Sequence, residues 1–142
     1  MSSEVQAAQQ EIVEEFSLFD DWMDRYQYII DLGRRLPAFP ESSMTDEHKI
    51  KGCQSQVWFV ADMQGDRLHF QATSDAAIVS GLIALLLRIY NDRTPADILE
   101  SSPDFVSKLG FEQHLSPTRS NGLASMLQAI HDFASEAAPS GR

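Results

Sequence analysis

The chain has 142 residues, of which 43% are hydrophobic and 23% are charged, as expected for one soluble globular domain rather than a disordered chain. Its 21 acidic and 11 basic residues give a formal net charge of −10. Because phosphate contacts need a basic surface, this balance argues against a nucleic-acid-binding protein and favours a partner with a basic face. We expect a single domain over residues 1–142.

The N-terminal part of the chain predicts two helices. Apolar residues recur at helical spacing from Val5 to Phe16, with glutamates and glutamines on the remaining positions. Asp20 and Asp21 are suited to cap a second helix over Trp22–Gly33, which Pro37 keeps from continuing. The aromatic residues of this helix could form a binding surface, but their helical spacing favours packing in the core.

The next segment predicts a β-hairpin. Residues 37–47 are rich in proline, serine and acidic residues and indicate a loop, and residues 48–51 could form a short edge strand. Residues 56–63 and 67–72 each alternate between apolar and polar side chains, and a glycine lies in the turn at 64–66. We therefore expect a small antiparallel sheet of about three strands.

The rest of the chain predicts further helices. Thr73, Ser74 and Asp75 are suited to cap a helix over Ala76–Tyr90, which is apolar on nearly all sides and should be central. Gly81 within it indicates close packing against the sheet. Other helices are expected near residues 95–100, at 103–109, and from Ser116 to the start of the tail at 137–142. The fold class is therefore α+β, a small antiparallel sheet packed against several helices.

Cys53 is the single cysteine of the chain and the best candidate for chemistry. It follows Gly52, which gives the backbone freedom to present a side chain on a loop tip. His48, Lys49 and Lys51 lie just before it, and nearby positive charge lowers a thiol pKa and raises its thiolate fraction. The alternative is a small buried hydrophobe, which is what most free cysteines are.

The composition limits the other kinds of site. One cysteine cannot form an intramolecular disulfide or supply a thiolate-rich zinc or iron–sulfur site. We expect no bound metal, because the histidines show no metal-ligand spacing (His48, His69, His114 and His131). A cysteine hydrolase would need a histidine base beside Cys53. Three of the histidines are candidates for that base, although their spacing places none of them there (His48, His69 and His114).

The N-terminal and apolar segments indicate a cytoplasmic protein. The first fifteen residues carry four glutamates and no lysine or arginine, unlike a secretory signal or a transit peptide. The apolar run at 82–87 is too short to span a bilayer. We expect neither a membrane nor a nucleic acid among the partners.

Residues 52–58, with the sequence GCQSQVW, resemble the signature of the SufE family of sulfur-acceptor proteins. Three further blocks resemble the family in the same order: residues 28–37, 74–82 and 114–123. Together they extend over about residues 22–130. The resemblance implies the family's fold, a small antiparallel sheet backed by helices and similar to the IscU-type scaffolds.

The resemblance also implies a function for Cys53. In the SufE family this cysteine accepts a persulfide from a pyridoxal-phosphate-dependent cysteine desulfurase, of SufS or CsdA type, and passes the sulfur to a SufBCD-type scaffold. The family thereby serves iron–sulfur cluster assembly and activates the desulfurase. The pyridoxal phosphate belongs to the partner, so we expect no cofactor in this chain, which also lacks a glycine-rich phosphate loop.

Several alternatives stay open within this resemblance. Arg119 matches an arginine in the family's last block, and it could favour the Cys53 thiolate or serve in a surface ion pair or in docking. The partner could be a paralogous desulfurase that feeds another sulfur pathway. The chain could instead be an interaction module without thiol chemistry, although one cysteine counts against a cluster scaffold. Whether it forms a homodimer is also open.

Overall fold

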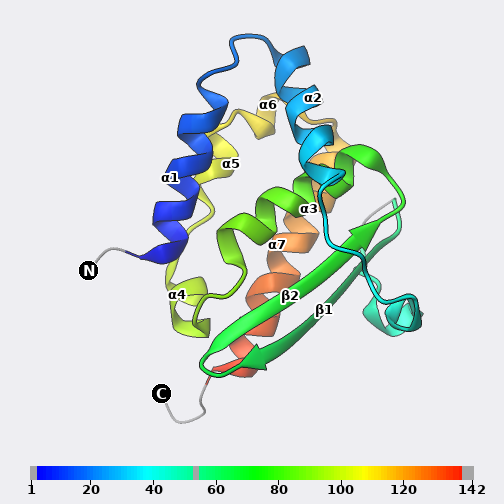
Figure 1. The fold of residues 1–142 in the computed structure, drawn as a ribbon. Helices are drawn as coiled ribbons and strands as arrows, with labels where there is room; N and C mark the ends of the chain where they lie inside the picture. Colours follow the sequence, from blue (N-terminus) through cyan, green and yellow to red (C-terminus); the bar gives the residue numbers. More distant parts are fainter. Residues whose placement is uncertain (1–2, 53–54, 139–142) are drawn as a thin grey trace.

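The computed structural model describes residues 3–52 and 55–138, and Figure 1 shows a β-hairpin lying against a group of helices. The N-terminal helices are α1 (Glu4–Phe16) and α2 (Trp22–Gly33). Two 3-10 turns, η1 (Glu41–Ser43) and η2 (Asp46–His48), precede the strands β1 (Val57–Gln64) and β2 (Arg67–Ser74). The helices that follow are α3 (Ala77–Tyr90), α4 (Pro95–Glu100), α5 (Asp104–Lys108), α6 (Phe111–His114) and α7 (Pro117–Ala137). The predicted α+β class is confirmed.

The first two helices begin at the capping residues that the sequence offers. The Ser3 side chain accepts a hydrogen bond from the backbone N–H of Gln6 at the start of α1. The Asp21 side chain accepts one from the backbone N–H of Met23 at the start of α2. Such bonds satisfy N–H groups that have no partner within the helix.

The two strands form one antiparallel hairpin in a register that runs from Val57 opposite Ser74 to Gln64 opposite Arg67. Because side chains alternate along a strand, one face of the hairpin is apolar. That face is buried in the core, and its buried residues are Val57, Phe59, Leu68, Phe70 and Ala72.

The third strand expected at residues 48–51 is absent from the described part of the chain. Lys49 pairs with Trp58 in one isolated bridge, and residues 46–48 form η2 instead. The sheet over residues 3–52 and 55–138 therefore has two strands.

Helix α3 is the centre of the fold, as its sequence predicts. Most of its side chains are buried, and it packs against both α2 and the hairpin. A Cβ atom added at Gly81 would lie 2.1 Å from the carbonyl oxygen of Ile29 in α2. The close packing predicted at Gly81 is confirmed, but its partner is α2 and not the sheet.

The C-terminal helices complete one continuous core. Thr94 and Ser116 cap α4 and α7 through their side chains, as the Thr-Pro and Ser-Pro pairs predict. Helix α6 was not expected, and it follows Gly110, whose φ of 77° ends α5. Within the described residues, no helix is both long enough and apolar enough to cross a membrane.

Candidate functional site

The predicted nucleophile, Cys53, lies outside the described residues, so the site is built from the residues on either side of it. Ile50 donates its backbone N–H to the carbonyl oxygen of Val57 across 2.9 Å. This bond closes the base of a short loop, residues 51–56, which we call the cysteine loop. The two ends of the loop are therefore held together at the entrance to β1.

Asp75 attaches the end of the cysteine loop to the start of α3. Gln56 donates its N–H to the Asp75 carboxylate across 3.0 Å, and Asp75 donates its own N–H to the Gln56 carbonyl across 3.3 Å. The prediction that Asp75 caps α3 is wrong, because Ala76 takes the N-cap position without a side-chain hydrogen bond. Capping preferences describe local contacts, so they could not indicate this bond between residues nineteen positions apart.

The other end of the cysteine loop lies against α7. Gly52 has a φ of 90°, a backbone conformation that side chains other than glycine's disfavour. A Cβ atom added to it would also lie 2.5 Å from Oγ of Ser125 in α7. The backbone conformation therefore favours glycine at this position, and any larger residue would also require the Ser125 hydroxyl to shift. Ser125 was missed in the sequence, which contains no motif that links it to the loop.

A small cavity of about 20 Å³ lies beside Ser55 at the point where the cysteine loop meets α3 and α7. Its wall is mainly apolar and includes Val57, Val79, Leu82, Leu123 and Met126. Thr118 and Arg119, from the first turn of α7, also line it. A cavity of this size holds about one water-sized group.

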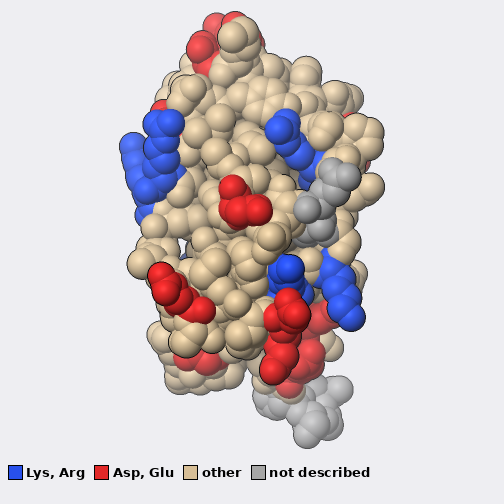
Figure 2. Space-filling view, turned by 90° about the vertical axis from the view of Figure 1, so that its right-hand side faces the viewer, with Lys and Arg blue, Asp and Glu red and all other residues tan. Residues whose placement is uncertain are grey.

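The surroundings of this cavity include positive charge. Arg119 has no carboxylate partner among the described residues, and its backbone N–H donates to the Ser116 side chain at the start of α7. The N-terminus of a helix carries partial positive charge, which adds to that of the guanidinium. The structure therefore places Arg119 beside the cysteine loop, where an anion would be favoured. Figure 2 shows that basic and acidic side chains alternate over the face of the molecule at the right of Figure 1.

The three histidines considered as bases for Cys53 have partners elsewhere. The ring of His48 contacts the Ser43 carbonyl at 2.8 Å, and His69 pairs with Asp92 at 2.8 Å. His114 stacks on Trp22 with 4.2 Å between ring centroids. None of the three lines the cavity beside Ser55. In the part of the chain that the structure describes, no three His, Cys, Asp or Glu residues are grouped to hold a metal ion.

Comparison with known proteins gives a consistent match. The family model SufE, described as an Fe-S metabolism associated domain, matches residues 10–134. An uncharacterized SufE-like protein of Rhizobium meliloti (strain 1021) is 43% identical over 125 residues, covering 84% of this chain and 89% of the relative.

Two more comparisons extend this match. An uncharacterized SufE-like protein of Rhizobium etli (strain ATCC 51251) is 41% identical over 133 residues, covering 90% of each chain. The solution structure of a hypothetical protein from Thermus thermophilus has a TM-score of 0.77 and 21% identity over 96% of this chain and 98% of that one. At this level of identity, the structural similarity shows a shared fold and nothing about function.

Proposed function

The chain belongs to the SufE family of iron–sulfur metabolism, and on that premise we propose that Cys53 accepts sulfur from a cysteine desulfurase. Family membership implies an interaction with such a desulfurase. The proposal adds that the sulfur is held as a persulfide on Cys53 and passed to a SufBCD-type scaffold that assembles iron–sulfur clusters. A paralogous pathway would use the same chemistry with another recipient.

The observation that carries the proposal is the small cavity beside Ser55. It is close to the cysteine in sequence, its wall is mainly apolar, and it has room for about one water-sized group. A persulfide adds a single sulfur atom to the thiol. An apolar site that excludes water and oxidants would protect this sulfur from further oxidation.

The charge around the cysteine loop supports the reactive form of the thiol. Arg119 and the N-terminus of α7 lie at one side of the cavity, and Lys51 lies in the loop itself. Positive charge of this kind lowers a thiol pKa, and the thiolate is the form that attacks sulfur. Of the two roles considered for Arg119, this setting favours support of the thiolate.

The proposed step is an exchange of one sulfur–sulfur bond for another. The Cys53 thiolate attacks the outer sulfur of the persulfide on the desulfurase, a new S–S bond forms, and the donor cysteine leaves as a thiolate. Nothing is oxidised or reduced overall. The pyridoxal phosphate belongs to the desulfurase, and this chain supplies the accepting thiolate and its surroundings.

The transfer requires Cys53 to enter the active site of another protein. Among the described residues, the contacts that oppose this movement include the two hydrogen bonds between Gln56 and Asp75 and the close approach of Gly52 to Ser125. The bond from the Gln56 N–H to the Asp75 carboxylate is exposed to solvent. We therefore expect the bonds between Gln56 and Asp75 to open during transfer, while the bond between Ile50 and Val57 keeps the base of the loop joined to β1.

Turnover of the desulfurase tests the proposal. We expect this chain to increase the rate at which a cysteine desulfurase releases alanine from cysteine, because it removes the sulfur that otherwise occupies the donor cysteine. Cys53→Ser should give no increase although it still binds. Equal stimulation by the wild type and by Cys53→Ser would leave an interaction module without thiol chemistry as the better description.

A further inference from the structure

A second cavity, of about 780 Å³, lies on the other side of α3 from the cysteine loop. It is bounded by α1, by the end of α2 and by the C-terminal half of α3, and we call it the arginine groove because Arg35, Arg88 and Arg93 line it. Val79 lines the cavity beside Ser55 and Arg88 lines the groove. These two residues are about two and a half helical turns apart, so they lie on opposite sides of α3.

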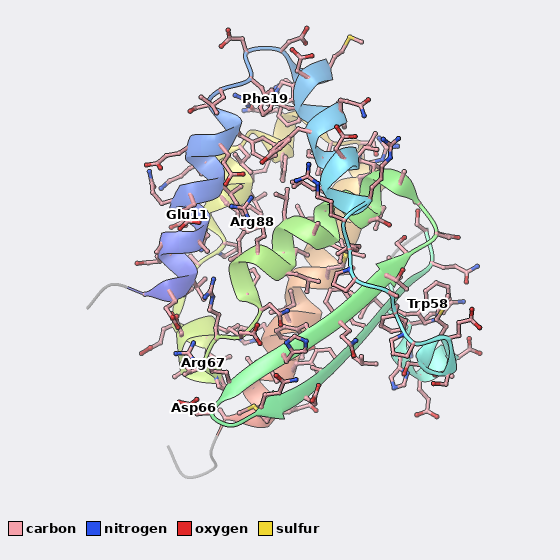
Figure 3. The ribbon with its side chains drawn as sticks, in the orientation of Figure 1. Glu11, Phe19, Trp58, Asp66, Arg67 and Arg88 are labelled. Carbon is pink, nitrogen blue, oxygen red and sulfur yellow. The ribbon has the colours of Figure 1, made fainter. Side chains whose placement is uncertain are left out.

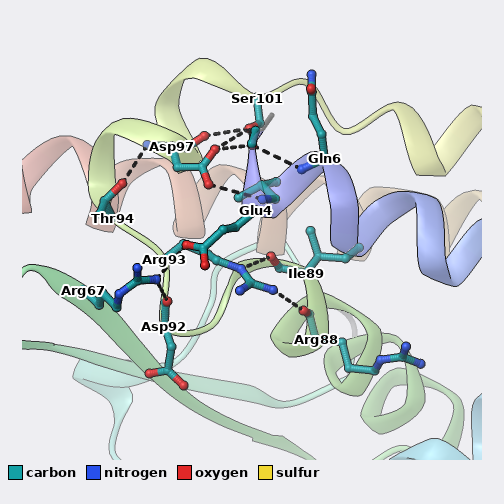
Figure 4. Close-up of polar contacts among 12 residues, drawn as sticks. Glu4, Gln6, Arg67, Arg88, Ile89, Asp92, Arg93, Thr94, Asp97 and Ser101 are labelled. Atoms are coloured by element: carbon teal, nitrogen blue, oxygen red, sulfur yellow. Dashed lines mark hydrogen bonds and ion pairs between the residues drawn. The ribbon is translucent and has the colours of Figure 1, made fainter. Parts of the chain in front are cut away.

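The three arginines differ in how much of their hydrogen-bonding capacity is used. Arg88 lies between α1 and α2 (Figure 3) and forms a two-bond ion pair with Glu15, with N–O distances of 2.7 and 2.5 Å. Arg93 donates from Nε and Nη2 to the carbonyl oxygens of Ile89 and Arg88 (Figure 4). The guanidinium of Arg35 has no hydrogen-bond or ion-pair partner among residues 3–52 and 55–138. Arg35 and Nη1 of Arg93 are thus available to a ligand.

The two acidic residues of the groove make their contacts with groups other than Arg35 and Arg93. Glu15 is already bound to Arg88 and to the hydroxyl of Tyr28, and Asp92 is paired with His69. Asn91 uses its side-chain oxygen to accept from a strand N–H, which leaves its amide hydrogens as donors. Although the chain has a net charge of −10, this groove contains arginine and amide N–H groups that donate no hydrogen bond within the described residues.

Apolar side chains form the floor of the same groove. Leu32 and Leu36 come from α2 and the segment after it, and Ala84 and Leu87 come from α3. A cavity of several hundred cubic ångströms with an apolar floor and a few converging polar groups is typical of a site for a small molecule. Arginine binds carboxylates well because its planar donors match the two oxygens.

We propose that the arginine groove binds a small monocarboxylate with an apolar body. Its carboxylate is held by Arg35 with Arg93 and Asn91, and its hydrocarbon part covers Leu32 and Leu87. An acidic side chain of a protein would meet the same donors, but the apolar floor of the groove favours a free molecule whose hydrocarbon part can cover it. The site does not involve Cys53, so this proposal does not depend on sulfur transfer.

A titration followed by ¹H–¹⁵N NMR tests the proposal, with octanoate as the probe. We expect saturable shifts in the backbone amides of Leu36, Asn91 and Arg93. Weaker binding is expected for 1-octanol, which lacks the carboxylate, and for acetate, which lacks the apolar body. Arg35→Gln should weaken octanoate binding about two- to fivefold, because Arg35 is exposed and solvent screens its ion pair with the carboxylate.

Arg34→Gln is the matched control, because Arg34 is exposed like Arg35 but pairs with Asp31 and does not line the groove. It should bind octanoate as the wild type does, and so should Cys53→Ser. The proposal is overturned if the shifts do not saturate, if octanol binds as well as octanoate, or if Arg35→Gln and Arg34→Gln behave alike. If the chain accepts no sulfur but binds octanoate normally, the proposed function is rejected and the carboxylate site in the arginine groove is supported.

Discussion

Gln56 and Asp75 are joined by two hydrogen bonds, from the Gln56 N–H to the Asp75 carboxylate and from the Asp75 N–H to the Gln56 carbonyl. They connect the end of the cysteine loop to the segment just before α3. A hydrogen bond to a charged group is stronger than one between neutral groups, although exposure to water reduces its net value. Asp75 therefore holds the end of the cysteine loop in place and does not cap a helix.

Replacing Asp75 by alanine should loosen the cysteine loop and leave the rest of the fold intact. We expect faster hydrogen exchange at the Gln56 amide and a loss of about 1 kcal/mol or less in the free energy of unfolding. Asp62→Ala, in the exposed part of β1, is the control. Unchanged exchange at Gln56 in Asp75→Ala would show that the bond does not hold the loop.

Gly52→Ala should destabilise the protein mainly through backbone strain, with a smaller loss from the shift that it imposes on the Ser125 hydroxyl. The positive φ costs about 1–2 kcal/mol for alanine, and the new Cβ would lie 2.5 Å from Oγ of Ser125. Gly65→Ala isolates the strain, because Gly65 also has a positive φ but nothing lies within 4 Å of its added Cβ.

Urea denaturation of these variants measures how much stability the contact with Ser125 costs. Gly52→Ala should lose more stability than Gly65→Ala, and the excess should shrink when Ser125→Ala removes the hydroxyl. The same loss in Gly52→Ala with and without Ser125→Ala would contradict the contact with α7.

Glu15→Gln should reduce stability at neutral pH but not in acid. The hydrogen bonds from the guanidinium of Arg88, together with that from Tyr28, lower the pKa of Glu15 below its usual 4.5 despite partial burial. A lowered pKa in the folded state adds stability that is complete above about pH 4.5 and is lost as the pH falls through the lowered value.

Unfolding curves at several pH values check this prediction. At pH 7 the free energy of unfolding of the wild type should exceed that of Glu15→Gln by on the order of 1 kcal/mol, a modest value because Glu15 and Arg88 are both partly exposed. The gap should close in acid. Glu14→Gln, an exposed neighbour on the same helix, should stay close to the wild type throughout. A gap for Glu15→Gln that persists at low pH would mean that packing, not charge, explains the loss.

Arg119→Gln should slow the reaction of Cys53 at neutral pH. Removal of the positive charge beside the cysteine loop should reduce the thiolate fraction, and the deficit should disappear at high pH, where the thiol is ionised in either protein. Alkylation by iodoacetamide across a range of pH measures this, with Arg34→Gln as the control. Identical pH profiles for Arg119→Gln and the wild type would assign Arg119 to docking instead.

Much of the fold could be predicted because its determinants are local. Periodicity and caps located α1, α2 and α7, and alternation located the hairpin. The errors concern contacts between distant segments. Capping preference assigned Asp75 to α3 although its carboxylate bonds to Gln56, and Gly81 approaches α2 and not the sheet.

The candidate site was predicted in part. The motif around Cys53 and the match at Arg119 pointed to residues that flank one cavity. Ser125 and the arginine groove could not be found in the same way. Their residues come from separate elements, and only the packing of α1, α2, α3 and α7 brings them to the surfaces they share.

The most direct test of the central claim is the intact mass of this chain after incubation with a cysteine desulfurase and free cysteine. Sulfur transfer to Cys53 predicts a gain of one sulfur atom, which is lost on reduction and absent in Cys53→Ser. If the mass stays unchanged while the desulfurase is demonstrably active, Cys53 is not a persulfide carrier and the proposed function is wrong.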